Sequence, residues 1–451
     1  MSPSRATFDR AVRRGATGLL AASLALVTGW WVEGGGLGDL VGWSSGLTSV
    51  GRWTGLVASV LLLSQVVLMA RVPVLEHAFG QDRLALVHRT VGFTSFTLML
   101  AHVVLLTWGY AAGSLLRWPA ELWDLTRTYP AMLLADAGFV ALVLVVVTSV
   151  RAARTRLRYE SWHLLHLYAY LGAGLALPHQ LWTGQELVSS TWRTVFWWTA
   201  WGAAAGSVLL WRVALPVTRN LRHRLRVEEV VEESPGVVSV VMTGRRLDRL
   251  RVQGGQWMSW RFLGRDGWTR AHPYSLSAAP DGHRLRITVQ AVGDGSGSTA
   301  TLTRGSRVLV EGPYGRLSPR SRHGESVALI GAGVGSAPLV ALAEELAPAG
   351  DVVVLHRSSG PGAFIEDLRR LADRGVRVLH LPGRRRRPDS WLGDAHAGRC
   401  SDLAALRHWV PDIAHRDVYV CGPTPWADLV IADLRRAGVP GTHIHVEAFG
   451  G

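Results

Sequence analysis

Two strongly apolar segments of this chain carry histidines, and these histidines constrain the fold more than any other feature. They are His88 and His102 in residues 88–108, and His163, His166 and His179 in residues 159–180. The second segment reads YESWHLLHLYAYLGAGLALPHQ, which is apolar enough to lie in lipid. An ionisable side chain inside a membrane segment is costly and marks a functional site by default. These imidazoles therefore require a partner.

Apolar runs recur through the first half of the chain, each near the roughly 20 residues that a helix needs to cross a bilayer. They lie near residues 15–32, 53–70, 87–107, 131–150, 162–182 and 194–215. Most of the 20 tryptophans precede residue 215, many near the ends of these runs, as in the aromatic belts of membrane proteins. The first run ends in Trp30 and Trp31 without a small-residue cleavage site, which favours a retained helix over a secretory signal. We therefore expect a six-helix transmembrane bundle over residues 1–215.

Arginines set the expected orientation of this bundle. Basic stretches are the N-terminus, residues 71–89, residues 151–158 and the residues after Trp211, whereas the loops 33–52, 108–130 and 183–193 have mixed charge. The positive-inside rule then predicts a multi-pass plasma-membrane protein with both termini in the cytoplasm. The net charge of +14 is explained by this orientation, and nucleic-acid binding is excluded because no basic recognition motif stands out. Cys400 and Cys421 are the two cysteines, so no disulfide framework is expected.

In this topology the third and fifth helices run in the same direction, so the histidines fall at two levels. His88 and His166 lie near the cytoplasmic side, and His102 and His179 near the outer side. The spacings of fourteen and thirteen positions separate the levels by about 20 Å at 1.5 Å per residue. Each level fits one b-type haem with an imidazole from each helix, a six-coordinate iron suited to electron transfer.

Two features of the fifth helix leave alternatives open. The thirteen positions between His166 and His179 do not return a helix to the same face. Pro178 could kink or break the helix and so change the direction of the His179 side chain. His163, one turn before His166, is interpreted as a partner for a haem propionate or as a packing residue. The histidines as a set have two other readings, polar contacts between helices and a proton relay in a transporter.

The paired histidines and the sequence WHLLHLYAY resemble the ferric-reductase and NADPH-oxidase transmembrane superfamily. The resemblance implies six helices with paired haem ligands on the third and fifth, which are His88, His102, His166 and His179 here. It also implies that a cytosolic module supplies electrons to the haems.

The pattern changes after Pro216. Short alternating runs with turn residues predict an antiparallel β-barrel over residues 216–320. From residue 321 the order of strand, glycine turn, helix and strand predicts a parallel α/β domain that extends to residue 451.

The expected barrel contains a motif that is similar to the flavin signature of the ferredoxin-reductase superfamily. It comprises His272, Pro273, Tyr274, Ser275, Leu276 and Ser277. The resemblance implies that Tyr274 packs on the isoalloxazine of FAD and that Ser275 reaches its N5 edge, while His272 replaces the usual arginine. The Gly-Pro-x-Gly element within residues 311–315 matches the end of the flavin barrel in this superfamily.

A glycine-rich turn follows the flavin motif. Its members Gly295, Ser296, Gly297 and Ser298 offer amides and hydroxyls to the pyrophosphate of FAD. A flexible hairpin is the equally weighted alternative.

The expected α/β domain opens with Gly331, Gly333 and Gly335 between a strand and a helix, the context that a phosphate-binding turn requires. The spacing is similar to that of the reductase superfamily. About 25 residues later Arg357 stands near the place of the acidic residue that holds the ribose of NAD. An arginine there favours NADPH, with NADH as the alternative.

Two C-terminal elements also resemble these reductases. Cys421, Gly422 and Pro423 match a Cys-Gly-Pro turn whose cysteine lies beside the nicotinamide, although a buried small residue at a strand end is the competing interpretation. Glu447 and Phe449 resemble a terminal acidic and aromatic pair, in which the aromatic ring covers the flavin. The resemblance thus implies catalytic roles for Ser275, Cys421, Glu447 and Phe449.

The predicted function combines these parts. Cytosolic NADPH reduces FAD, and two haems carry electrons to an outer acceptor, which is a small molecule such as oxygen or a ferric chelate, or a redox protein. The alternative is a membrane-anchored flavin reductase that donates electrons to a partner haem, a quinone or a periplasmic redox protein.

Overall fold

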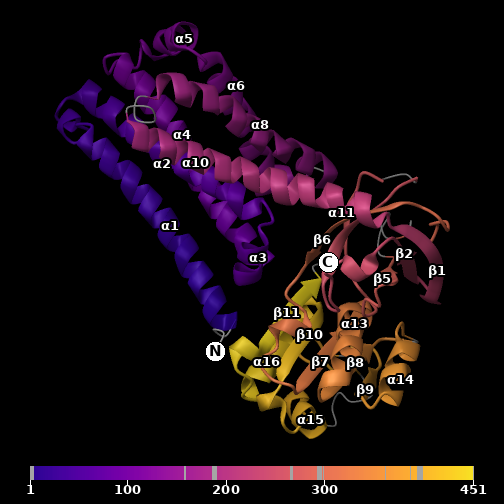
Figure 1. Ribbon diagram of the computed structural model, residues 1–451. Helices are drawn as coiled ribbons and strands as arrows, with labels where there is room; N and C mark the ends of the chain where they lie inside the picture. The colour runs from indigo at the N-terminus through magenta and orange to yellow at the C-terminus, as the bar shows by residue number, and fades with distance from the viewer. Residues whose placement is uncertain are drawn as a thin grey trace. The chain divides into compact units, whose positions relative to one another are not determined.

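The computed structural model describes residues 5–156, 159–184, 190–264, 268–291, 297, 299–360, 362–385, 387–393 and 400–449. Two compact units divide the chain, Met1–Ala214 and Leu215–Gly451 (Figure 1). The first unit is helical, and the second contains all of the described strands.

The first unit consists of long helices joined by short ones. Its elements are α1 (Arg5–Glu33), η1 (Gly38–Val41), α2 (Trp43–Met69), α3 (Pro73–Phe79), α4 (Gln81–Tyr110), α5 (Trp118–Thr128), α6 (Met132–Ser149), α7 (Arg151–Arg154), α8 (Tyr159–Thr183), α10 (Thr191–Ser207) and the π-helical turn η2 (Val208–Ala214). Helix α2 packs along α4, and α6 packs along α8. These two pairs place the histidine-bearing helices α4 and α8.

Within the described residues, five helices are long and apolar enough to cross a membrane. They are Thr7–Glu33, Trp43–Met69, Gln81–Tyr110, Met132–Ser149 and Thr191–His223. The remaining predicted segment, 162–182, lies within α8, which is not among the five because histidines and Gln180 interrupt its apolar sequence. Helix α8 continues through Pro178 to Thr183, so a helix break at this proline is not what directs His179.

Two kinds of packing hold the first unit together. Buried side chains of α1, α2 and α10, among them Val27, Leu56 and Trp197, form a hydrophobic cluster. Helices α6 and α8 instead meet at two glycines. A Cβ at Gly138 would lie 2.7 Å from the carbonyl oxygen of Gly172, and the reverse distance is 2.9 Å. The backbones of α6 and α8 are therefore in contact, which leaves no room for a side chain at either position.

The second unit begins with α11 (Leu215–His223) and two three-stranded antiparallel sheets. One has the order β1 (Arg226–Ser234), β2 (Val237–Thr243), β5 (Arg284–Gln290), and the other β4 (His272–Ser275), β3 (Trp257–Phe262), β6 (Val308–Tyr314). The region predicted as a barrel contains these two sheets. Single antiparallel bridges, Leu276 to Ile287 and Arg226 to Arg307, join them at both edges. Their inward side chains share one hydrophobic core.

A five-stranded parallel sheet completes the second unit. Its order is β11 (Ile444–Phe449), β10 (Asp417–Pro423), β7 (Val327–Ala332), β8 (Val352–Ser358), β9 (Arg377–Pro382). Helices α13 (Ala337–Leu346) and α14 (Ile365–Asp373) pack in one core cluster, and α15 (Asp402–Trp409) and α16 (Thr424–Arg436) in another. The predicted parallel α/β arrangement is confirmed. In chain order the strands are arranged 3-2-1-4-5, so the topological switch point lies between β7 and β10.

Short helical turns connect these elements. They are η3 (Leu247–Arg249), η4 (Pro319–Ser321), η5 (Gly333–Ser336), η6 (Ala347–Ala349), η7 (Ile413–His415) and η8 (Gly441–His443). Turn η5 joins β7 to α13 and thus lies at the switch point.

Candidate functional site

Helices α4 and α8 bring the first predicted histidine pair together. The ring centroids of His88 and His166 lie 6.1 Å apart, with the ring planes at 67°. Two imidazole nitrogens bound to opposite sides of one metal ion at about 2.0 Å each place their ring centroids roughly 6 Å apart. The separation of His88 and His166 therefore fits two axial ligands of one iron.

The second predicted pair is His102 on α4 and His179 on α8, whose imidazoles are close enough to interact electrostatically. Helix α2 fixes the first of these rings. Nδ1 of His102 donates a hydrogen bond to the carbonyl oxygen of Gly51 at 2.8 Å. A Cβ at Gly55 would lie only 2.4 Å from the same nitrogen. The absence of a side chain at Gly55 is thus what lets the His102 ring lie against α2.

All four rings use Nδ1 for a hydrogen bond within the protein. His88 pairs with the carbonyl oxygen of Gln65 at 3.3 Å, His166 with Oγ of Ser149 at 3.2 Å, and His179 with Oγ1 of Thr183 at 2.7 Å. Among the residues that the structure describes, none of the four Nε2 atoms has a hydrogen-bond partner. A ligating histidine typically donates its other ring N–H in this way, which leaves Nε2 for the metal.

Thr183 gives His179 a fixed orientation one helical turn before the end of α8. Its hydroxyl donates to the carbonyl oxygen of His179 at 2.7 Å and so accepts from Nδ1 of the same residue. This contact, rather than a break at Pro178, holds the ring. The two residues are four positions apart, so the sequence contained this signal.

Aromatic and polar side chains also support His166, and the sequence analysis missed them. The Trp162 ring lies 5.1 Å from the His166 ring, and its Nε1 donates to Oγ of Ser149 at 3.3 Å. The guanidinium of Arg154 lies 4.4 Å above the Trp162 ring. His163 is near enough to interact electrostatically with His166. The spacing of four between Trp162 and His166 was the available signal.

In the second unit, β4 carries the predicted flavin motif beside β3. The rings of His272 and Tyr274 are stacked, with centroids 5.7 Å apart and planes at 8°. Ser275 is 4% exposed, and its buried Oγ has no hydrogen-bond partner within the described part of the chain. A buried hydroxyl without a partner is uncommon in proteins, and this one is available to a ligand. Ser275 thus fits the role expected of it beside FAD.

The end of the flavin motif faces the protein interior instead. Leu276 and Ser277 are fully buried, and Oγ of Ser277 accepts hydrogen bonds from Arg286 at 3.1 Å and Thr288 at 2.8 Å. Arg286 also forms a bidentate pair with the buried Asp367 of α14, at 3.1 and 2.9 Å. This network links the motif to the parallel-sheet domain. Of the predicted pyrophosphate turn, Gly295, Ser296 and Ser298 lie outside the described residues, and Gly297 lies within them.

Glu447 joins the two parts of the second unit. A Cβ at Gly315, the last glycine of the Gly-Pro-x-Gly element, would lie 3.0 Å from Oε1 of Glu447 and 2.9 Å from the ring of Trp257. Trp257 in turn pairs with Ser275 across β3 and β4. On the other side, Glu447 pairs with Cys421 across β11 and β10. The predicted catalytic residues Ser275, Cys421 and Glu447 therefore lie around one junction.

Phe449, the fourth predicted catalytic residue, is the last residue of β11, and its backbone pairs with Pro423. Cys421 itself is fully buried. Burial, with a smaller contribution from the charge of Glu447, raises the pKa of the Cys421 thiol well above its ordinary value. The raised pKa favours the neutral thiol over the reactive thiolate at this position.

The predicted phosphate turn lies at the switch point of the parallel sheet, where open α/β sheets bind ligands. Three of its glycines are required by close approach or conformation. A Cβ at Gly331 would lie 2.5 Å from Oγ of Ser336, and a Cβ at Gly335 would lie 2.8 Å from Cα of Gly422, while Gly333 has φ of +56°. The turn after β7 and the turn after β10 thus meet backbone to backbone.

Polar residues at the end of β8 form hydrogen bonds with neighbouring segments. Nη2 of Arg357 donates to the carbonyl oxygen of Gly383 at 3.4 Å. The preceding His356 is buried and hydrogen-bonds through Nδ1 to Oγ of Ser336 at 2.7 Å. Ser358 bonds to Nε2 of His380 at 2.7 Å. The sequence analysis identified Arg357 but not its histidine neighbours.

Comparison with known proteins gives matches to both parts of the predicted architecture. Residues 54–177 match the family described as ferric reductase like transmembrane component. The ferredoxin reductase component of 3-ketosteroid-9-alpha-monooxygenase from Mycolicibacterium smegmatis is 31% identical over 242 residues, which cover 50% of this chain and 65% of that protein. A flavohemoprotein from Deinococcus radiodurans is 33% identical over 243 residues, 50% of this chain and 58% of that protein.

Among solved structures, the flavohem-like FAD/NAD binding domain of nitric oxide dioxygenase from Vibrio cholerae is 26% identical. The match covers 51% of this chain and all of that chain, with a TM-score of 0.42. The chain spans less than two thirds of the length of the two curated relatives. It therefore carries a segment of the ferric reductase like transmembrane family and is related over half of its length to ferredoxin reductase components and flavohemoproteins.

Proposed function

We propose that this protein is a membrane oxidoreductase that passes electrons from cytosolic NAD(P)H through FAD and two b-type haems to an acceptor on the outer side. The observation that carries the proposal is the arrangement of the two histidine pairs. One pair has the 6.1 Å ring separation that two axial ligands require, and each of the four rings is held at Nδ1 with Nε2 available to a metal. The match of residues 54–177 to the ferric reductase like family supports the same assignment.

The protein's own residues hold these groups in line. His88 and His166 would ligate the inner haem, and His102 and His179 the outer one. When bound, the haems would supply reversible one-electron transfer, and these four imidazoles would hold them. Thr183 and the α2 backbone keep the outer ligands in a single orientation, which minimises rearrangement when the charge of the iron changes.

In the second unit, the buried hydroxyl of Ser275 would donate a hydrogen bond to FAD, with Tyr274 against its ring. Amides of the turn at Gly331, Gly333 and Gly335 would bind the dinucleotide phosphates at the switch point. Arg357 would bind a 2′-phosphate, so NADPH is the preferred donor. Cys421 and Glu447 meet where the nicotinamide would approach, and the neutral thiol limits unfavourable charge there.

The membrane topology follows from the arginine distribution. Helix α8 would be the sixth crossing, since its 25 residues are long enough to span the bilayer. Both termini would then lie in the cytoplasm of a multi-pass plasma-membrane protein. The outer acceptor would be oxygen, a ferric chelate or a redox protein.

Inside-out vesicles that contain the protein test this proposal, because they expose the cytosolic face to added NADPH. Reduction of a ferric chelate and production of superoxide inside the vesicles would each be measured. We expect one of these activities, and we expect His102→Ala to abolish it while NADPH oxidation by a soluble dye at the flavin continues. Unchanged transfer across the membrane in His102→Ala would show that the outer haem assignment is wrong.

A further inference from the structure

Three histidines and one aspartate form a cluster at the amino-terminal ends of the parallel strands. The proposed nicotinamide site lies at the opposite, carboxyl-terminal ends. Asp417 begins β10, His443 and His445 flank the start of β11, and His323 precedes β7. The amino-terminal ends of these three parallel strands meet at this edge, whereas the glycine turn and Cys421 lie at the carboxyl ends. Nothing in the proposed electron path uses these residues.

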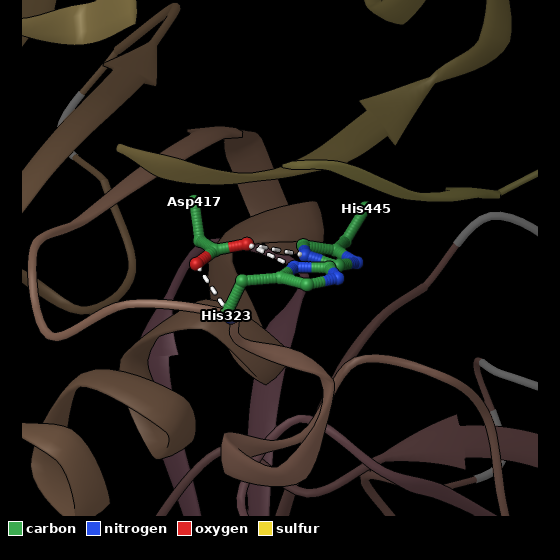
Figure 2. A group of neighbouring side chains, drawn as sticks. All are labelled: His323, Asp417 and His445. Atoms are coloured by element: carbon green, nitrogen blue, oxygen red, sulfur yellow. Dashed lines mark hydrogen bonds and ion pairs between the residues drawn. The ribbon is translucent and has the colours of Figure 1, made fainter. Parts of the chain in front are cut away.

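The carboxylate of Asp417 is directed toward His323 and His445 (Figure 2). Its Oδ1 lies 3.0 Å from Nδ1 of His323, 3.0 Å from Nε2 of His445 and 4.0 Å from Nδ1 of His443. The ligand atoms of His323, Asp417 and His445 all lie within 4.8 Å of one another. Four ligands around a tetrahedral Zn²⁺ at about 2.0 Å lie roughly 3.3 Å apart. The ligand atoms would have to approach one another by up to about 1.5 Å, and the stacked imidazole rings would have to rotate, to form such a coordination shell.

The second oxygen of Asp417 keeps the carboxylate in place. Oδ2 accepts hydrogen bonds from the backbone N–H groups of His323 at 2.7 Å and Gly324 at 2.9 Å. Asp417 is 1% exposed, and this burial raises the pKa of its carboxyl. The hydrogen bonds from the side chains of His445 and His323 and from the backbone N–H groups of Gly324 and His323 together hold that pKa far below its usual range. The result is an ionised carboxylate with one oxygen fixed and the other turned toward three imidazoles.

His443 offers the cluster a ring nitrogen that can bind a ligand. Its Nδ1 is buried and has no hydrogen-bond partner among the described residues. Its ring stacks on His323 with centroids 4.6 Å apart and planes at 6°. The side chain of His323 is 39% exposed, so an ion can enter from solvent.

We propose that His323, Asp417, His443 and His445 bind a divalent transition metal ion, preferably Zn²⁺, through three imidazole nitrogens and one carboxylate oxygen. Imidazole with a single carboxylate suits Zn²⁺, whereas Ca²⁺ and Mg²⁺ require oxygen ligands. Binding requires only that each ligating nitrogen give up its proton to the other ring nitrogen or to water, so no oxidant or reductant is needed.

The bound ion would join three segments that are far apart in the chain. His323 and Asp417 are 94 positions apart, and Asp417 and His445 are 28 apart. Strand β11 is an edge strand held by β10 alone. Two residues beyond His445 it carries Glu447, and it ends at Phe449. The metal would thus fix the strand that presents the C-terminal residues of the proposed active site.

Zinc binding by the purified full-length protein tests this inference. The protein would be dialysed against zinc-buffered solutions, and bound zinc would be measured by elemental mass spectrometry, which distinguishes it from haem iron. We expect one zinc ion per chain. His443→Ala is the primary variant, because His443 forms no hydrogen bond whose loss would disturb the fold. The exposed His408 of α15 supplies the matched control.

We expect His443→Ala and His323→Ala to weaken zinc binding by at least about ten-fold, and His408→Ala to leave it unchanged. X-ray absorption at the zinc edge should show imidazole scattering that decreases in His443→Ala. Zinc binding of equal strength in the wild type and in both cluster variants would overturn the inference, as would a spectrum without imidazole ligands. Neither result depends on haem or flavin content.

Discussion

Gly55→Ala should remove the proposed outer haem although it replaces none of the proposed ligands. A Cβ at this position would lie 2.4 Å from Nδ1 of His102, whereas ordinary contact begins at 3.4 Å. The ring must therefore move by about 1 Å, twice the roughly 0.5 Å that a preorganised site tolerates. The same movement breaks the 2.8 Å hydrogen bond to the carbonyl oxygen of Gly51. Loss of such a supporting contact costs about 10- to 100-fold in metal affinity.

The assay is the ratio of haem to protein in the purified chain, together with a redox titration of the haem absorption. In Gly55→Ala we expect the ratio of haem to protein to fall from two per chain toward one. We also expect the redox titration to show one reduction step in place of two. Gly202→Ala is the matched control, since a Cβ at Gly202, also in a membrane helix, would meet nothing within 4 Å. Two haems with unchanged potentials in Gly55→Ala would refute the reasoning about His102.

Further predictions concern the second unit. Arg286→Ala leaves Arg370 as the remaining ion-pair partner of the buried Asp367 among the described residues, and should lower the free energy of unfolding by roughly 3 kcal/mol. The control Arg284→Ala removes an exposed pair with Glu228 and should lower it by at most about 1 kcal/mol. Equal losses of the two variants in urea unfolding would contradict this prediction. Burial, and to a smaller extent the neighbouring His380, lowers the pKa of His356 to about 4. Between pH 6.5 and pH 4 this imidazole is therefore protonated in the unfolded chain but not in the folded chain. The free energy of unfolding should therefore decrease by roughly 3 kcal/mol as the pH falls from 6.5 to 4. Pulse proteolysis at a series of pH values should find a smaller decrease in His356→Asn. An equal decrease in the variant and the wild type would contradict the prediction. Arg357→Ala should raise KM for NADPH by roughly 10- to 100-fold and leave that for NADH nearly unchanged; equal effects on both would exclude a 2′-phosphate contact.

The sequence predicted the parts of this molecule that depend on periodicity and local motifs. Apolar runs identified the membrane helices, because crossing a bilayer requires length and apolarity. The strand, glycine turn and helix around Gly331 identified the parallel domain, because a phosphate turn needs that local order. The four histidines were recognised because an imidazole is conspicuous in an apolar segment.

Contacts between distant segments could not be predicted in this way. The hydrogen bond of His102 to Gly51 and the contact with Gly55 depend on how α2 and α4 pack, which no local pattern specifies. The cluster around Asp417 joins residues from three segments that are far apart in the sequence, and no motif with a fixed spacing contains them all. The pairing order of the strands in the two bridged sheets could not be predicted either, because strand pairing depends on tertiary packing. Helix α8 continues through Pro178 although the sequence suggested a break.

The most direct test of the central claim is anaerobic addition of NADPH to the purified full-length protein in detergent. We expect two haems and one FAD per chain, and we expect the flavin absorption to bleach while the Soret and α bands of reduced haem appear. Reduction of flavin without haem bands would contradict the account and would leave a membrane-anchored flavin reductase in its place.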